Sequence, residues 1–169
     1  MKKQVKFESH EIILKLMTEN ENQKYCAIRN RVENRKWFTD RNVLSEQEQE
    51  NWFKQYLVKE SDYMFSIYNM QGDFLGGNAI YHIDFVQGIA EYGRLLKDTA
   101  VMYTKGTGYL ATMAAIAIAK EQLQLQQLYL EVYQDNLVAV KIYERAGFEI
   151  KDRTQDSSGR EMYKMIIKL

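Results

Sequence analysis

The fold of this 169-residue chain is decided by residues 136–148, which read NLVAVKIYERAGF. Ala139, Tyr143 and Gly147 recur every four residues, so Ala139 and Tyr143 share one face of a helix predicted over residues 137–146. Asn136 is a residue type that caps helix N-termini, and a glycine such as Gly147 commonly ends a helix. The spacing therefore predicts a capped helix that carries the Tyr143 hydroxyl on a defined face.

A glycine loop lies one predicted strand upstream, in residues 103–111, which read YTKGTGYLA. Gly106 and Gly108 stand at the start of a helix predicted over residues 107–120. Backbone amides at a helix N-terminus are unpaired and carry partial positive charge, and glycine lets a phosphate approach them closely. Lys105 adds a positive charge beside them. The loop therefore suits a pyrophosphate, although two glycines also serve simply to turn a chain into a helix.

Two other phosphate-binding motifs compete for this loop. A Walker loop is excluded, because no Gly-Lys-Ser or Gly-Lys-Thr follows the glycines. Gly106, Gly108 and Ala111 do fit a dinucleotide-binding fingerprint, and Glu131 follows about 20 residues later. Only residues 132–169 remain beyond it, too few for the further parallel strands and a substrate site. A dinucleotide-dependent oxidoreductase is therefore the weaker alternative.

Composition limits the partners and the compartment. The 23 basic and 23 acidic residues cancel, so we expect neither nucleic acid nor an anionic membrane as a partner. Cys26 is the only cysteine, which excludes an internal disulfide and a cysteine-built zinc site and favours the cytoplasm. The basic N-terminus lacks the apolar stretch of an export signal, and the longest apolar run is too short to span a bilayer. We expect no metal site.

We expect a single domain over residues 1–169, because the length suits one core and no proline, linker or repeat divides the chain. Apolar periodicity predicts four helices and seven strands. The helices are predicted over 19–34, 46–58, 107–120 and 137–146, and the strands over 12–17, 63–68, 74–83, 89–96, 127–132, 147–151 and 160–168.

The glycine loop and the later helix together resemble the GNAT acetyltransferase superfamily. The match covers residues 89–168 well, and the preceding order of strands and helices agrees with it. The resemblance implies an α+β fold in three layers, an acyl-CoA N-acyltransferase fold whose mixed central sheet has about seven strands flanked by about four helices. It also implies acetyl-CoA as co-substrate and a small-molecule amine as acceptor. A homodimer is compatible with it.

The resemblance further implies where the cofactor binds. In the family, the loop binds the CoA pyrophosphate, the preceding strand pairs with the pantetheine arm, and a tyrosine of the later helix lies near the thioester sulfur. This chain departs from the family at Tyr103, where Gln or Arg is usual, which affects details of phosphate contact. The residues carried over are Tyr92, Arg94, Leu95, Leu96, Lys105, Gly106, Thr107, Gly108, Tyr109, Asn136 and Tyr143.

Two residues are predicted to be catalytic. By the resemblance, Tyr143 is the acid that protonates the departing thiolate. Glu91 alternates with Ile89 and Gly93 along a predicted strand, which is an unusual face for an unpaired carboxylate. It is either the base that meets the acceptor ammonium or the partner of an arginine in a salt bridge.

A basic and aromatic cluster near the N-terminus is the candidate acceptor site. Guanidinium groups suit diphosphate, and aromatic rings suit a base or sugar face. The cluster resembles GNAT members that acetylate nucleotide-linked amino sugars, and related members modify ribosomal-protein N-termini. A solvated helix face, another small amine as acceptor and a non-catalytic acyl-CoA sensor remain alternatives. The predicted acceptor-binding residues are Arg29, Asn30, Arg31 and Trp37, with Arg35, Lys36, Phe38, Arg41 and Trp52 nearby.

Overall fold

The computed structural model describes residues 2–101 and 105–169. Within them, eight strands form one sheet in the order β1-β2-β3-β4-β5-β6-β8-β7. The parallel pair is β5 with β6, and the other neighbouring pairs are antiparallel. The strands are β1 (Lys6–Glu8), β2 (Ile13–Leu16), β3 (Tyr63–Tyr68), β4 (Phe74–Asp84), β5 (Ile89–Lys97), β6 (Gln127–Tyr133), β7 (Glu149–Gln155) and β8 (Glu161–Lys168).

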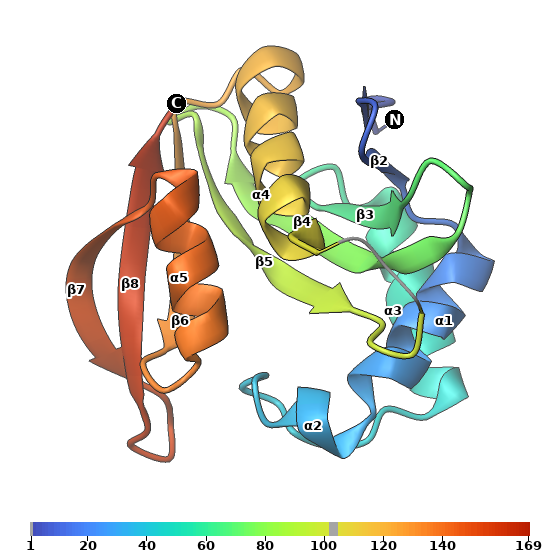
Figure 1. Cartoon of the computed structure of the whole chain (residues 1–169), viewed down its shortest axis with the longest axis horizontal. Helices are drawn as coiled ribbons and strands as arrows, with labels where there is room; N and C mark the ends of the chain where they lie inside the picture. The colour runs from blue at the N-terminus through green and yellow to red at the C-terminus, as the bar shows by residue number, and fades with distance from the viewer. Residues whose placement is uncertain (1, 102–104) are drawn as a thin grey trace.

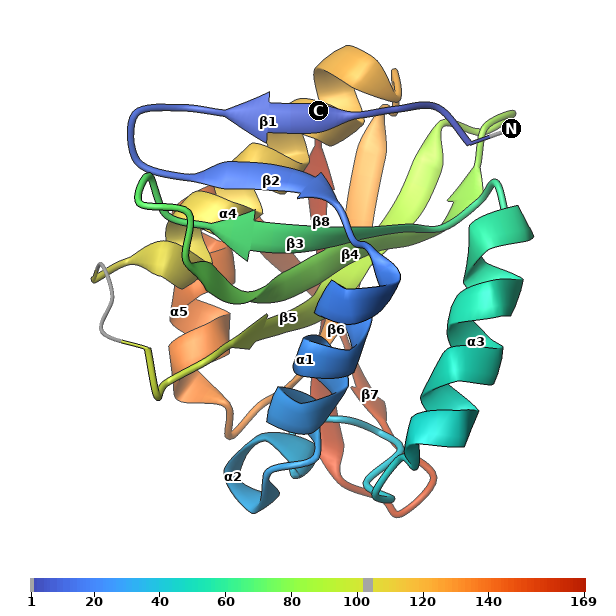
Figure 2. The ribbon, with the colours of Figure 1, turned by 90° about the vertical axis from the view of Figure 1, so that its right-hand side faces the viewer.

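Helices cover both faces of this sheet, as Figures 1 and 2 show. On one face, α4 and α5 pack over a core that includes Tyr92, Leu128 and Leu130. On the other, α1 and α3 pack over a smaller core that includes Tyr25 and Met64. The helices are α1 (Glu19–Arg29), α2 (Val32–Arg35), α3 (Glu46–Val58), α4 (Thr107–Ala117) and α5 (Leu137–Ala146), and a π-helical turn at Ile118–Gln122 follows α4. The predicted three-layer α+β fold is confirmed. No helix in the described ranges is long and apolar enough to cross a membrane.

The structure adds one strand and one helix to the prediction. β1 is an edge strand of three residues, too short to show an apolar alternation. The helix predicted over residues 19–34 ends at Arg29 instead, and α2 begins after Arg31, whose backbone is extended. The side chain of Asn30 explains the break, because it bonds to both backbone groups of Leu44 and so fixes the following loop.

The sheet opens between β5 and β6. These strands pair only where Ile89–Glu91 meets residues 127–129, and they separate beyond that point. The register of β4 against β5 shifts between Gly77 and Ala79, opposite Arg94, whose φ is +54°. Such a bulge bends a strand, so β5 turns away from β6. The gap lies between the two helical layers, and it positions the site described next.

Candidate active site

A cavity of about 580 Å³ runs through the gap between β5 and β6. At one end it is lined by residues of α4 and α5, and at the other by residues of the α1 and α3 face. We call these the cofactor end and the acceptor end. The cofactor end includes Thr107, Gly108, Asn136, Val138, Ala139, Ile142 and Tyr143, and the acceptor end includes Trp37, Phe38, Thr39, Tyr81, His82, Glu91, Arg94, Glu131 and Tyr133.

Glycine shapes the start of α4 at the cofactor end. Gly106 is the N-cap with φ +91°, and a glycine has no side chain with which to cap the helix. Gly108 lies against α5, because a Cβ at this position would stand 2.9 Å from Cδ1 of Ile142. Gly108 therefore both packs against α5 and lines the cavity. Lys105 is exposed, and Tyr109 packs under the guanidinium of Arg145, 3.9 Å from its ring centroid. Tyr103 lies outside the described residues.

Tyr143 brings a hydroxyl to the cavity from a buried ring. The ring packs edge-on against Tyr92 and Phe148, with centroids 6.0 Å away in each case. In the described part of the chain the hydroxyl has no hydrogen-bond partner, and burial raises its pKa well above the usual value. The group is therefore protonated at neutral pH. Asn136 caps α5 by accepting from the Ala139 amide (3.3 Å) and also lines the cavity, so capping does not keep it from the site.

The predicted cofactor residues of β5 divide between the two ends. The Tyr92 hydroxyl bonds to Thr112 Oγ1 at 3.0 Å, and burial raises its pKa to about 12. Tyr92 and Leu95 line the cavity. Leu96 does not, because it is buried in the core beneath α1 and α3. The Arg94 guanidinium also lies on the acceptor side, over the rings of Trp52 and Tyr81.

Glu91 is held at the acceptor end by two neighbours. The Tyr81 hydroxyl donates to its Oε1 at 2.8 Å, and His82 Nδ1 lies 2.9 Å from its Oε2. His82 has φ +51°, a conformation uncommon for any residue but glycine. Among the described residues the ion-pair contact of Glu91 is with His82 rather than with an arginine. Sequence reasoning missed His82, because it reaches Glu91 only through the irregular register between Tyr81 and Asp84.

Of the predicted acceptor residues, only Trp37 lines the main cavity. Arg29 is buried and donates to the carbonyl oxygens of Asp40 (2.7 Å) and Asn42 (3.2 Å). Arg31 pairs with Asp98 at 2.6 Å. The Arg29 contacts and the Asn30 bonds described above hold the loop after α2 in place, whereas the Arg31 pair joins the segment between α1 and α2 to the residue after β5. The structure therefore does not bring Arg29, Asn30 and Arg31 to the main cavity, because their polar groups bind their own chain.

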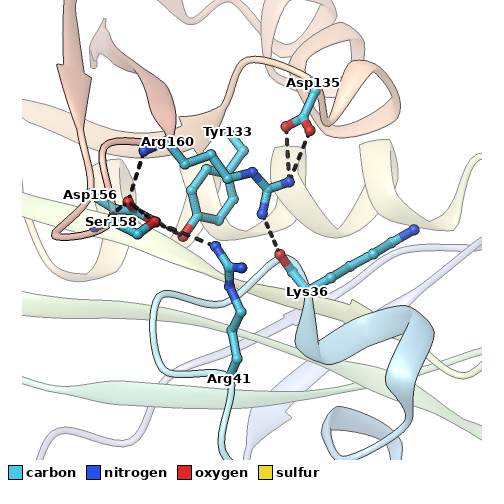
Figure 3. A network of polar contacts seen from close by, with 7 residues as sticks. All are labelled: Lys36, Arg41, Tyr133, Asp135, Asp156, Ser158 and Arg160. Atoms are coloured by element: carbon cyan, nitrogen blue, oxygen red, sulfur yellow. Dashed lines mark hydrogen bonds and ion pairs between the residues drawn. The ribbon is translucent and has the colours of Figure 1, made fainter.

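The same loop is tied to the far side of the acceptor end, as Figure 3 shows. Arg160 donates to the carbonyl oxygen of Lys36 at 2.8 Å and to the Asp135 carboxylate at 2.9 and 3.0 Å. Its guanidinium also lies 3.8 Å from the ring centroid of Tyr133, and Arg41 pairs with Asp156 at 3.5 Å. This network joins the α2–α3 loop to the β7–β8 hairpin, with Trp37 and Tyr133 forming walls of the cavity.

The chain is similar to known proteins in both sequence and fold. A family model for the acetyltransferase (GNAT) domain matches residues 11–149. Curated protein sequences give no match. The structure of spermidine N-acetyltransferase from Vibrio cholerae with CoA and spermine is similar, with TM-score 0.83 and 19% identity over 95% of this chain and 96% of that one. A dodecameric structure of spermidine N-acetyltransferase from that organism gives TM-score 0.78 and 18% identity, covering 95% of each chain. At these identities the likeness establishes the fold alone.

Proposed function

Because the chain belongs to the GNAT acetyltransferase family, we propose that it transfers the acetyl group of acetyl-CoA to the primary amine of a small-molecule acceptor. The observation that carries this proposal is the cavity through the sheet. It joins the start of α4, where Gly106 is the N-cap, and the hydroxyl of Tyr143 to the carboxylate of Glu91. A thioester held from one end can therefore meet an amine held at the other.

The cofactor binds at the cofactor end in this proposal. Its pyrophosphate meets the amides from Lys105 to Tyr109, where the partial positive charge of the helix start favours an anion. Its pantetheine arm lies along the edge of β5 that β6 leaves unpaired beyond Glu91, between Tyr92 and Leu95. Asn136 contacts the arm, and Tyr143 lies at the sulfur. Each of these contacts is a residue-by-residue expectation from the family.

The reaction moves protons at both the acceptor nitrogen and the thiolate of CoA. An alkyl ammonium has a pKa of about 10, so Glu91 takes a proton from it, directly or through water. The neutral amine attacks the thioester carbonyl, a C–N bond forms, and backbone amides of β5 stabilise the oxyanion. The C–S bond then breaks, and Tyr143 protonates the thiolate of CoA. The nitrogen loses its second proton, which returns to Tyr143 directly or through solvent, and Glu91 releases its proton to solvent.

Three classes of acceptor are considered: a nucleotide-linked amino sugar, a ribosomal-protein N-terminus and a small amine. The sugar hypothesis rested on the arginine cluster, and Arg29 and Arg31 bind their own chain instead. A small acceptor is supported by the walls that Trp37 and Tyr133 form and that Arg160 joins. Spermidine enters the comparison because the similar Vibrio cholerae enzyme is a spermidine N-acetyltransferase.

Release of free thiol from acetyl-CoA tests the function, with UDP-linked amino sugars, short peptides and spermidine as acceptors. Turnover of any amine supports an acetyltransferase. Thermal stabilisation by acetyl-CoA without turnover indicates a sensing domain, and stabilisation by NAD alone indicates an oxidoreductase. A ligand at 100 times its Kd stabilises by about 2.7 kcal/mol, which such a measurement resolves.

We propose that the protein is a homodimer in the cytoplasm. Sedimentation of the purified chain tests the homodimer, and a dodecamer, as in the similar enzyme, is the alternative outcome. The single cysteine, which is buried and free, is the observation that favours the cytoplasm.

A further inference from the structure

Arg94 is held in an unusual conformation at the acceptor end. Its φ of +54° lies in the left-handed region, which costs an ordinary residue free energy. Its carbonyl oxygen accepts a hydrogen bond from the buried Tyr25 hydroxyl at 2.7 Å, which fixes this geometry. The bulge places the guanidinium between two rings, 5.5 Å from the centroid of Trp52 and 4.2 Å from that of Tyr81.

Within the described residues, the guanidinium donates a hydrogen bond to the thioether sulfur of Met64, at 3.6 Å. Throughout residues 2–101 and 105–169, no carboxylate lies within ion-pair distance of it. A guanidinium has five N–H donors, and that of Arg94 is half-buried at the cavity, where its donors are open to a ligand. Other arginines of this region, such as Arg29 and Arg31, have carbonyl or carboxylate partners.

Arg94 also stands where two cavities meet. A second cavity of about 360 Å³ shares Phe38, Thr39 and Arg94 with the main one, and Trp52 forms part of its wall. Arg29 also lines the second cavity, with the carboxylates of Asp40 and Glu48, each of which accepts a backbone amide hydrogen bond. Glu48 accepts from the Ser45 amide at 2.8 Å in the cap of α3, and Asp40 accepts from the Asn42 amide at 3.0 Å.

We propose that Arg94 binds an anionic group of the acceptor, either a carboxylate or a phosphate. This inference rests on the proposed function and names the class of acceptor: a primary amine whose molecule also carries a negative charge. Tyr81 sets the spacing, because its hydroxyl bonds Glu91 and its ring lies under Arg94. The amine meets Glu91, the anion meets Arg94, and the rest of the acceptor extends along Phe38 and Trp52 into the second cavity. A polyamine would place a cation beside the guanidinium.

Matched pairs of amines test the proposal. O-phosphoethanolamine is compared with ethanolamine, β-alanine with propylamine, and a UDP-linked amino sugar with the free amino sugar. Wild-type enzyme should favour the anionic member of at least one pair by about 10- to 100-fold in kcat/KM, the range of one charge-assisted hydrogen bond. The pair with the largest ratio distinguishes phosphate from carboxylate. Arg94→Met should remove the preference, mainly by raising KM for the anionic member of the pair.

Arg153→Met is the control, because Arg153 also lies over a tyrosine ring, that of Tyr163, but lines neither cavity. It should keep the wild-type preference. Should Arg94→Met fail to fold, Arg94→Lys is the second variant. It retains the positive charge but lacks the paired N–H donors of a guanidinium, so it should lose part of the preference. A wild-type enzyme that turns over neutral amines or spermidine as well as the anionic ones overturns the proposal, as does Arg94→Met with an intact preference. Absence of turnover with every amine would instead defeat the proposed function.

Discussion

Tyr143 has a hydroxyl at the cavity and a ring held by Tyr92 and Phe148, so its two roles can be separated. Tyr143→Phe keeps the ring and removes the proton donor. We expect kcat to fall by about 10- to 1,000-fold while the Kd for acetyl-CoA changes by at most a few fold. Steady-state kinetics with calorimetry on the folded variant measures both. Wild-type kcat would reduce Tyr143 to a packing residue.

Glu91→Gln should produce a defect that depends on pH. The carboxylate is needed only while the acceptor is an ammonium, so kcat/KM should fall by about 100-fold or more at pH 7. The gap to wild type should narrow as the pH approaches about 10, where the free amine is neutral. Glu131→Gln serves as comparison, since Glu131 also lines the cavity. Parallel pH profiles for Glu91→Gln and wild type would remove Glu91 as the base.

At the scale of elements, the start of α4 combines ligand access with packing. Gly108→Val puts a branched side chain where the pyrophosphate is proposed to approach, and also against Ile142. We expect weaker acetyl-CoA binding by calorimetry. The double variant Gly108→Val with Ile142→Ala relieves the contact between α4 and α5 and should recover stability without recovering affinity. Recovery of both would show that the glycine serves packing alone.

The N-terminus of α1 is fastened to the sheet through Glu21. Burial alone would raise the pKa of this carboxyl, but hydrogen bonds from the Thr18 amide, Tyr68 and Ser66, with Lys15 nearby, lower it from 4.5 to about 2. Because the pKa of Glu21 is lower in the folded state than in the unfolded state, its carboxylate stabilises the folded protein at pH values above 4.5. This stabilisation is lost as the pH falls from 4.5 to about 2. Glu21→Gln should therefore lower the free energy of unfolding by up to about 3 kcal/mol at pH 7, and by less at pH 3. Urea unfolding at both pH values checks this.

Sequence patterns located most elements but not their cross-connections. The ends of α3 and α5 agree with the prediction, because a capping box at Ser45 and the Asn136 and Gly147 caps mark them locally. The break after Arg29 was not predictable, since it depends on Leu44, which is distant in sequence. The pairing of His82 with Glu91 depends on a strand irregularity, and the environment of Arg94 on three separate elements. Local periodicity does not encode such contacts.

At the scale of the whole molecule, Arg160 connects the two sides of the acceptor end, drawn in Figure 3. Arg160→Met removes the bonds to Lys36 and Asp135 while keeping much of the apolar stem. We expect the acceptor KM to rise several-fold because the wall carrying Trp37 loosens. The Kd for acetyl-CoA should change less, because Arg160 bonds Asp135, beside Asn136, and not a residue of the cofactor end itself. Equal losses for both substrates would point to global destabilisation instead.

The opening between β5 and β6 also has a consequence for the order of events in a catalytic cycle. Residues from both faces of the sheet line the cavity, so in the proposed function each substrate approaches from its own face without blocking the other. In that arrangement both substrates can be bound at once, so the transfer does not require a covalent acetyl-enzyme intermediate. In the same way, CoA and the acetylated product can leave from opposite faces of the sheet.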